Sequence, residues 1–363
     1  MNLSNKNYCI ILAGGRGKRL WPSSRMERPK QFMDFFGTGR TQLQATFDRM
    51  ASIIPQENIF VCTCKDYEHL VREQLPELPT HHLLSEPVTR NTAPAVAWAG
   101  VCIHRECADA RIVILPSDQI IFNEKAFLKN VLDGLTFVSE NDIMLTMGIK
   151  PSRPEPGYGY IQMGEPTPFQ GISKVQSFTE KPERDFARVF MESGEFLWNT
   201  GMFLCNVLYL RQFLIDTIKD MPYRMADLLD MEPEEKRTLY VNEYFPAYPN
   251  LSMDKAALEM SDNVYVMQCD FGWADLGTWH AIYECMQKQD DDNVIIDSEV
   301  MMDDCKGNII KLPKGHIGII NGLEGYIVAE EGDVLLICKK SDSSSLIRKY
   351  VNEAGIRYGE KYI

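Results

Sequence analysis

The stretch YCIILAGGRGKRLWPSSRMERPKQF, from Tyr8 to Phe32, decides the fold. A short apolar run with β-branched residues leads into three glycines, Gly14, Gly15 and Gly17, and then into many cationic side chains. Glycines let backbone N–H groups approach an anion, because there is no Cβ in the way. In open α/β sheets, ligands bind outside the carboxyl ends of the strands. The stretch therefore predicts a first strand that ends in a phosphate-binding turn.

The charge of this stretch is opposite to that of the whole chain. The 363 residues carry a net charge of -13. From residue 16 to residue 30, six cationic side chains stand against one acidic residue, Glu27, a local excess of five: Arg16, Lys18, Arg19, Arg25, Arg28 and Lys30. Exposed charges beyond roughly 8 Å are largely screened at physiological salt, so a bound anion experiences this loop more than the acidic remainder. The overall charge argues against nucleic acid as a partner.

The remaining composition indicates a globular protein in the cytoplasm. The longest apolar runs, such as CIILA and VLLIC, are far shorter than the roughly 20 residues that cross a bilayer, so no membrane partner is expected. The ten cysteines form no C-x-x-C pair and lie mostly in apolar segments. We interpret them as reduced core residues, not as a disulfide framework or a zinc site.

Strand-like and helix-like segments alternate through the first half of the chain. Such alternation predicts β-α-β units and an α/β fold with a Rossmann-like mixed, mostly parallel sheet. The expected strands are YCIIL, IFVCTC, HHLL, RIVILP and IMLTMGI, and the expected helices are 43–53, 67–75, 92–105 and 124–139.

The rhythm changes after Ile149. GYGYIQM and ISKVQSFTEKP read as strands, helices are expected from Pro182 to Glu259, and a last strand, VYVMQCDFGW, leads to a turn that carries Asp275. The acidic cluster QKQDDDN separates this part from strand-like runs with glycine turns and a closing helix over 343–354. We predict an α/β domain over residues 1–288 and a small β-rich domain over residues 289–363.

The glycine turn fits neither common phosphate-binding template. A Walker A loop requires Ser or Thr after Gly17-Lys18, where Arg19 stands, and a dinucleotide fingerprint requires a third glycine where Leu20 stands. What remains is L-A-G-G-x-G-x-R-L-x-P followed by Pro29-Lys30. On these residues the chain resembles the sugar-1-phosphate nucleotidylyltransferases, most closely their mannose-1-phosphate guanylyltransferase branch. Further motifs in the same order agree: EPVTRNTAPAVA, LPSDQ, GYGYI, FTEKP, WNTGMF and GWADLGTW.

This resemblance implies a reaction, a cofactor and an assembly. GTP and mannose 1-phosphate would give GDP-mannose and pyrophosphate by in-line attack of the sugar phosphate on the α-phosphorus, with Mg²⁺ as cofactor. Positioning and charge neutralisation supply most of the catalysis in such a reaction. The resemblance also implies a homodimer, and a C-terminal domain that is a short β-helix-like extension of the nucleotidyltransferase domain.

Two aspartates are the expected metal ligands. Asp118 follows the strand-like RIVILP and Asp275 follows VYVMQCDFGW, so both carboxylates could meet at one sheet edge. Mg²⁺ prefers oxygen ligands and usually takes one or two carboxylates. The alternative is that either aspartate caps a helix. The resemblance favours the metal.

Three cationic residues are expected to be catalytic: Arg16 and Lys30 on the triphosphate, and Lys181 on the sugar phosphate. For Lys18, Arg19, Arg25 and Arg28, a solvated basic loop is the alternative for at least half. The resemblance assigns Glu180 to the sugar hydroxyls, together with Gly159 and Asn199. Strand alternation would send Glu180 and Lys181 to opposite faces, so this assignment requires irregular backbone before Pro182. A charged turn, a tight turn at Gly159 and a structural asparagine are the competing readings.

The resemblance places guanine at Glu86, Asn91 and Thr92, beside Arg90, although Asn91 or Thr92 could instead only cap a helix. The other expected nucleotide-binding residues are Ala13, Gly14, Gly15, Gly17 and Ser117. One departure from the family pattern is Gln119, which stands where histidine is usual.

Two other functions stay open at this stage. One is a sibling transferase with another sugar or base. The other is a non-catalytic paralogue that binds a nucleotide sugar and regulates a partner. The charged set expected of an active enzyme is present, which argues against the second.

Overall fold

The computed structural model describes residues 6–218, 234–341 and 343–363. It contains two compact units that are interleaved in sequence. The first unit comprises residues up to Gly14, then Thr46–Ser117 and Ile121–Trp273; the second comprises Gly15–Ala45, Asp118–Ile120 and Ala274–Ile363. The sequence-based boundary between independently folding domains, expected at residues 288/289, stays a prediction.

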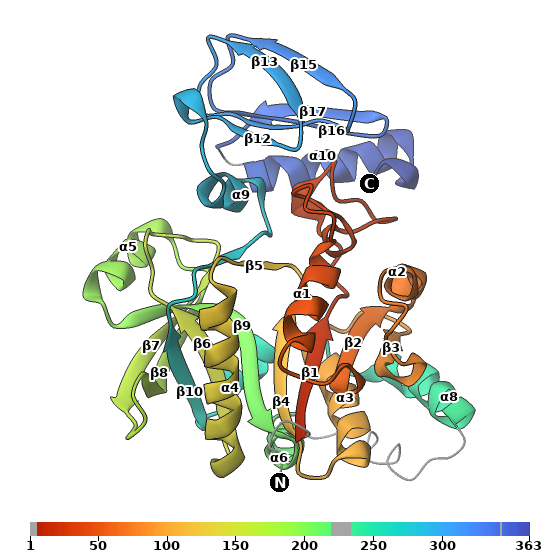
Figure 1. The fold of residues 1–363 in the computed structure, drawn as a ribbon, viewed down its shortest axis with the longest axis vertical. Helices are drawn as coiled ribbons and strands as arrows, with labels where there is room; N and C mark the ends of the chain where they lie inside the picture. The colour runs from red at the N-terminus through yellow and green to blue at the C-terminus, as the bar shows by residue number, and fades with distance from the viewer. Residues whose placement is uncertain (1–5, 219–233, 342) are drawn as a thin grey trace. The chain divides into compact units, whose positions relative to one another are not determined.

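A nine-stranded mixed sheet forms the centre of the first unit, in the order β3-β2-β1-β4-β9-β6-β10-β8-β7 (Figure 1). The strands from β3 to β4 are parallel, and Ile10 pairs with both Phe60 and Ile114. This arrangement confirms the α/β fold with a mixed sheet. The sheet is not mostly parallel as expected, because β9 pairs antiparallel with β4 and β6, and β8 pairs antiparallel with β10 and β7. The strand bounds are β1 Asn7–Leu12, β2 Ile59–Cys64, β3 Leu83–Glu86, β4 Arg111–Pro116, β6 Met144–Ile149, β7 Gly159–Pro166, β8 Ile172–Glu180, β9 Phe196–Asn206 and β10 Val264–Cys269.

Helices α3, α4 and α6 begin at asparagines whose side chains cap them. Asn123 accepts a hydrogen bond from the Ala126 N–H at the start of α4, and Asn206 accepts one from Tyr209 N–H at the start of α6. The helices with residues in this unit are α1 Gln42–Ala51, α2 Glu68–Gln74, α3 Thr92–Glu106, α4 Glu124–Glu140, α5 Arg184–Ser193, α6 Val207–Thr217 and α8 Glu234–Tyr244.

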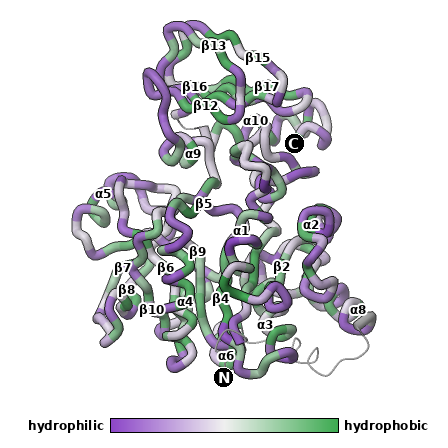
Figure 2. The backbone as a smooth tube through the Cα atoms, viewed as in Figure 1, coloured by the Kyte–Doolittle hydropathy of each residue, from purple (hydrophilic) through white to green (hydrophobic). Residues whose placement is uncertain are grey.

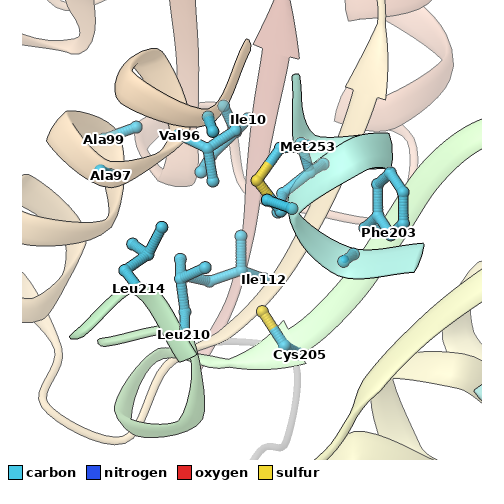
Figure 3. Close-up of a cluster of buried hydrophobic side chains, with 14 of the residues drawn as sticks. Ile10, Val96, Ala97, Ala99, Ile112, Phe203, Cys205, Leu210, Leu214 and Met253 are labelled. Atoms are coloured by element: carbon cyan, nitrogen blue, oxygen red, sulfur yellow. The ribbon is translucent and has the colours of Figure 1, made fainter. Parts of the chain in front are cut away.

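The main core of the first unit lies between the sheet and helices α3 and α6. Figure 3 shows Ile10 and Ile112 of the strands near Val96 and Leu210 of these helices, and Phe203 of β9 beside the segment that carries Met253. All of these side chains are at most 1% exposed. Figure 2 shows the same pattern along the chain, with β1 and β4 hydrophobic. Burial on both faces explains why these strands read as continuous apolar runs.

The expectation of helices from Pro182 to Glu259 is confirmed by α5, α6 and α8 but is incomplete, because the long strand β9 also lies within this range. β9 pairs antiparallel with β4, β6 and β7. Its motif WNTGM hides the strand, since Gly201 adopts a left-handed φ of 69° and the pairing with β6 shifts register at Thr146/Gly148. A strand that is buried on both faces and interrupted in this way gives no period-two signal.

The second unit contains the β-rich C-terminal part that was expected. The strands β12 Val294–Ile296, β14 Ile309–Lys311 and β16 Tyr326–Glu331 are parallel, and β17 Val334–Lys339 closes the sheet antiparallel to β16. β13 Glu299–Asp303 pairs in parallel with β15 Ile317–Asn321. Two buried asparagines link successive turns, because Asn308 Nδ2 donates to Asn293 Oδ1 at 2.9 Å and Asn308 Oδ1 accepts from Tyr326 N at 2.8 Å.

The segment after the glycine turn packs within this second unit. The Trp21 indole N–H donates to the Tyr362 carbonyl at 2.7 Å, and the Trp279 indole N–H donates to the Trp21 carbonyl at 3.2 Å. Trp21 and Trp279 share one buried cluster with side chains of the C-terminal strands and of α10 Ser343–Tyr358, while α9 Trp279–Cys285 begins at Trp279. The N-terminal motif is therefore folded into the C-terminal part of the protein.

Among the described residues, no helix combines the length and the apolar character needed to span a membrane. None of the ten cysteines, all of which lie among the described residues, forms a disulfide bond.

Candidate functional site

The glycine turn contains one glycine that the fold requires and one that it does not. Gly17 has a φ of 59°, and a Cβ at this position would collide with the Ser24 hydroxyl. Gly15 has no such restriction, since no atom of the described chain lies within 4 Å of where its Cβ would be. Gln31 Nε2 donates to the Gly15 carbonyl at 2.8 Å and holds the turn. Open space beside Gly15 is what a phosphate-binding turn needs.

Lys30, Asp118 and Asp275 form one cluster in the second unit. Lys30 Nζ lies 2.7 Å from Asp118 Oδ2 and 3.8 Å from Asp275 Oδ1. It also donates to the Leu276 carbonyl at 3.4 Å. Burial by itself would lower the pKa of Lys30, but the attraction of Asp118 and Asp275 outweighs burial and raises it. Lys30 is therefore a charged ammonium between two carboxylates.

A small sheet brings these two aspartates together. β5 Gln119–Ile121 pairs with β11 Trp273–Asp275, so Asp118 directly precedes one strand and Asp275 ends the other. Neither aspartate caps a helix: a strand follows Asp118, and α9 is capped by Thr278, whose Oγ1 accepts from Ala281 N at 3.1 Å. The capping alternative is wrong at both positions.

The other cations of the loop differ in their surroundings. Arg19 lies beside the cluster. Its positive charge repels that of Lys30 and acts to lower the pKa of Lys30, and a Cβ on Gly277 would come within 2.8 Å of Arg19 Nη2. Arg25 Nη1 lies 3.2 Å from Asp333 Oδ1, and Arg28 Nε donates to the Phe32 carbonyl at 3.2 Å. Arg25 and Arg28 thus have structural contacts, whereas Arg16 and Lys18 are exposed.

Ala13 and Ser117 lie at the carboxyl ends of β1 and β4 in the first unit. Ala13 N donates to the Cys62 carbonyl at 2.8 Å, and Ser117 N donates to the Leu12 carbonyl at 3.0 Å. The two adjacent strand ends therefore stay side by side beyond the sheet itself. Gly14 follows Ala13 and is the last residue of this segment of the first unit. A Cβ on Gly14 would fit, at an ordinary contact distance of 3.8 Å from Cys64 N.

Glu180 and Lys181 lie at the end of β8, where the backbone leaves the strand. Lys181 has a φ of 47°, which is uncommon for a residue with a Cβ. Its Nζ forms an ion pair with Glu180 Oε1. The irregular backbone that the sequence argument required is therefore present. Gly159 is paired with Glu180 and begins β7, and it is not part of a tight turn. A Cβ at Gly159 would come within 2.7 Å of the Phe178 ring and 2.9 Å of Glu180 Oε2.

Asp254 is a neighbour of this group that the sequence reasoning missed. Asn199 Nδ2 donates to Asp254 Oδ1 at 2.6 Å, and Asn199 Oδ1 accepts from Gly201 N at 3.1 Å. Burial and the nearby charge of Glu180 raise the pKa of Asp254. No pattern in LSMDKAAL separates this aspartate from an ordinary helix start. A π-helical turn, Lys255–Glu259, follows it directly, and such turns are frequent at functional sites.

The residues expected at the base lie at the end of β3 and the start of α3. Glu86 is 6% exposed, and burial raises its pKa to about 8. Asn91 Oδ1 accepts from Thr92 N at 3.0 Å, so the helix-capping reading applies to Asn91. Thr92 Oγ1 accepts from Met253 N at 2.8 Å. Met253 precedes Asp254, so this short segment links the start of α3 to the Asn199 group.

Comparisons with known proteins identify the family. A family model described as nucleotidyl transferase matches residues 8–292. The alginate biosynthesis protein AlgA of Pseudomonas putida is 34% identical over 335 residues, which cover 91% of this chain and 68% of that protein. A mannose-1-phosphate guanylyltransferase of Salmonella muenchen is 33% identical over 348 residues, 94% of this chain and 72% of that protein.

A solved structure shows the same architecture. It is described as a mannose-1-phosphate geranyltransferase from Thermus thermophilus. It superimposes with a TM-score of 0.85 at 28% identity, covering 96% of this chain and 99% of that one.

Proposed function

Because the chain belongs to the nucleotidyl transferase family, we propose that this nucleotidyltransferase transfers GMP from GTP to mannose 1-phosphate and releases pyrophosphate. The observation that carries the proposal is the cluster of Lys30, Asp118 and Asp275 in the unit that also holds Gly15 and Gly17 of the glycine turn. The choice of mannose and guanine follows the Salmonella muenchen relative.

The donor set of the cluster suits a magnesium ion. Asp118 and Asp275 supply only oxygen ligands. Both carboxylates lie near the same cationic group, the Lys30 ammonium. Asp118 and Asp275 would hold Mg²⁺, which supplies charge neutralisation for the phosphates when it is bound. The Lys30 ammonium within the cluster and the Arg19 guanidinium beside it both oppose a cation, so Lys30 has to balance between the carboxylates and the phosphates of the substrate.

The chain's own cations would bind the triphosphate. Arg16 lies exposed in the turn. Lys30 is fixed at both ends: its backbone N–H donates to Ser24 Oγ at 3.0 Å, and its ammonium contacts the two carboxylates. Positive charge at these positions stabilises the departing pyrophosphate more than the intact triphosphate, because the negative charge on the leaving oxygens grows in the transition state.

The sugar phosphate would be held by the group around Glu180. Asp254 orients the Asn199 amide through one of its two N–H donors, which leaves the second N–H for a sugar hydroxyl. Lys181 balances Glu180 in the free protein and would bind the phosphate of the incoming sugar. The nucleophile is a phosphate oxygen, ionised near pH 7, so a side-chain base is unnecessary and Gln119 costs the reaction nothing.

The base would be bound beside Glu86. A carboxylate can accept the N1 and N2 protons of guanine, which adenine does not offer in the same arrangement. Burial keeps Glu86 largely protonated near neutral pH in the free protein. Guanine binding would favour the ionised form, since two donors would then face the carboxylate.

The experiment that tests the proposal is a pyrophosphate-release assay with Mg²⁺. GTP, ATP, UTP and dTTP are each combined with mannose 1-phosphate and with glucose 1-phosphate. We expect the fastest release with GTP and mannose 1-phosphate. A different best pair would identify a sibling transferase, and no release with any pair would indicate a non-catalytic paralogue.

Two matched variants test the metal ligands. Asp118→Asn and Asp275→Asn keep the side-chain shape and remove one negative charge each. We expect both to lose turnover while circular dichroism shows an intact fold. Turnover near that of the wild type in both variants at saturating Mg²⁺ would refute the metal assignment.

An exposed apolar face supports a homodimer. Met301 on β13 pairs with Ile319 on β15, and both are exposed, at 61% and 74%; Ile317 on β15 is 70% exposed. Contiguous exposed apolar side chains mark interaction surfaces. Light scattering should give the mass of two chains, and Ile317→Lys with Ile319→Lys should give one. Asp303→Lys on β13, which reverses a charge outside this apolar group, serves as the control.

A further inference from the structure

A cluster of two histidines and a glutamate lies in the first unit, among residues that the proposed reaction does not use. His82 Nε2 lies 3.0 Å from Glu106 Oε1, and His81 Nε2 lies 3.8 Å from the same oxygen. The three ligand atoms are all within 4.8 Å of one another. His81 and His82 belong to the 3₁₀ turn Thr80–His82, and Glu106 ends α3.

The cluster is held in place by residues from two strands. His82 is 2% exposed, and its ring stacks on Phe60 of β2 with the centroids 4.0 Å apart. The Tyr8 hydroxyl of β1 hydrogen-bonds to the Glu106 carboxylate. Partners of this kind fix the orientation of metal ligands in proteins. His82 and Glu106 are therefore oriented before any ion arrives.

The distances are close to those of a tetrahedral site. With metal–ligand bonds of about 2.0–2.1 Å, tetrahedral ligands stand about 3.3 Å apart. The observed 3.0 Å and 3.8 Å to Glu106 lie on either side of this value, and the two imidazole nitrogens lie within 4.8 Å of each other, so closing the site requires side-chain movements of at most about 1.5 Å. A hydrogen bond explains the pair of His82 and Glu106, but it gives no reason for a second imidazole nitrogen near the same carboxylate oxygen.

The cluster also has an open side. His81 and Glu106 line a cavity of about 530 Å³, together with Arg72, Arg105 and Arg237. Two neutral imidazoles and one carboxylate leave a divalent ion with one net positive charge, which suits a water or a small anion as the fourth ligand. Two nitrogen donors favour Zn²⁺, whereas Mg²⁺ prefers oxygen donors such as Asp118 and Asp275.

We propose that His81, His82 and Glu106 bind a transition-metal ion of the Zn²⁺ class, with a water or small anion from the adjoining cavity as its fourth ligand. The ion ties the turn Thr80–His82 to the last turn of α3. The site is separate in residues and in donor chemistry from the proposed magnesium site.

Zinc titration of the full chain tests this proposal. The protein is stripped with EDTA, transferred to buffer with saturating Mg²⁺ and titrated with Zn²⁺ in a calorimeter. We expect one strong Zn²⁺ per chain. His81→Ala and Glu106→Gln should weaken it at least tenfold. His81 is largely exposed, so its variant should fold, and Glu106→Gln keeps an acceptor for Tyr8 and His82. His69→Ala, an exposed histidine outside the cluster, is the control and should bind as the wild type does.

Cobalt provides a second readout that separates this site from the ten cysteines. Co²⁺ held by nitrogen and oxygen gives visible bands without the intense near-ultraviolet absorption of a thiolate ligand, and His81→Ala should lose those bands. Zn²⁺ should also raise the unfolding temperature of the wild type and of His69→Ala more than that of His81→Ala. The proposal is overturned if the wild type binds no Zn²⁺, if His81→Ala and Glu106→Gln bind it unchanged, or if the cobalt spectrum shows thiolate ligation.

Discussion

Replacing Lys30 by methionine tests the centre of the proposed site. Lys30→Met keeps the apolar stem and removes the ammonium that lies 2.7 Å from Asp118 and 3.8 Å from Asp275. At an effective dielectric constant near 20, these two attractions correspond to about 6 and about 4 kcal/mol before the cost of burying the lysine. Removal of one partner from such a buried group costs about 3–5 kcal/mol, because the remaining charges stay uncompensated. We expect a loss of about 3 kcal/mol in the free energy of unfolding.

Magnesium should reverse much of this loss. In the wild type the ammonium competes with Mg²⁺ for Asp118 and Asp275, whereas in Lys30→Met the carboxylates are free for the ion. A ligand at 100 times its dissociation constant stabilises the folded state by about 2.7 kcal/mol. Urea unfolding followed by circular dichroism, with EDTA and then with Mg²⁺, should therefore show a larger Mg²⁺ effect in the variant than in the wild type.

Turnover should not recover along with stability. Lys30 is proposed to stabilise the charge on the departing pyrophosphate, and loss of one such contact typically lowers turnover about 100-fold or more. Lys18→Met removes an exposed lysine from the same loop and is the control for stability. The reasoning fails if Lys30→Met unfolds at the wild-type urea concentration in EDTA and gains no more from Mg²⁺ than the wild type does.

Three further predictions concern the other parts of the site. The pKa of Glu86 is raised from 4.5 to about 8, so between these pH values the folded chain binds more protons than the unfolded chain. The free energy of unfolding should therefore fall as pH rises, by about 1.4 kcal/mol per pH unit at most. Glu86→Gln should flatten this pH dependence in urea titrations at pH 5 and pH 8, and an unchanged pH dependence in the variant would contradict the prediction. Gly15→Ala should weaken GTP binding and leave the unfolding temperature unchanged. Gly17→Ala should weaken GTP binding and also lower the unfolding temperature, because only a Cβ at residue 17 collides with the chain. Equal unfolding temperatures for the two variants would count against this prediction. Asp254→Asn should raise the KM for mannose 1-phosphate about tenfold, the cost of one charged hydrogen bond, and leave the KM for GTP unchanged. A rise only in the KM for GTP would show that Asp254 acts on nucleotide binding and not on the orientation of Asn199.

The order of the elements in the first half of the chain could be predicted from sequence because each signal is local. Apolar runs such as Cys9–Leu12 and Ile112–Leu115 form parallel strands buried on both faces, and such strands read as uninterrupted hydrophobic segments. The strand β9 could not be predicted in this way. Its residues are interrupted by Asn199 and Gly201, and its place at the sheet centre is decided by pairing with β4 and β6, which are distant in sequence.

The candidate site shows the same division. The residue types at Lys30, Asp118 and Asp275 allowed phosphate and metal chemistry, and the resemblance to the nucleotidylyltransferase family favoured metal binding over helix capping for the two aspartates. Their contact depends on the pairing of β5 with β11, which no local pattern announces. The helix-cap alternative for the two aspartates could only be rejected once the strand after Asp118 and the cap at Thr278 were known.

The sequence by itself determined an α/β fold with a glycine turn rich in positive charge, since periodicity, glycine positions and charge are properties of neighbouring residues; the nucleotidyltransferase assignment came from the resemblance of its motifs to that family. Only the tertiary structure decided that the segment after the turn packs with the C-terminal strands, that Lys30 lies between two carboxylates, and that Asp254 orients Asn199. Each of these depends on long-range burial and pairing, whose free energy comes from partners that are far apart along the chain.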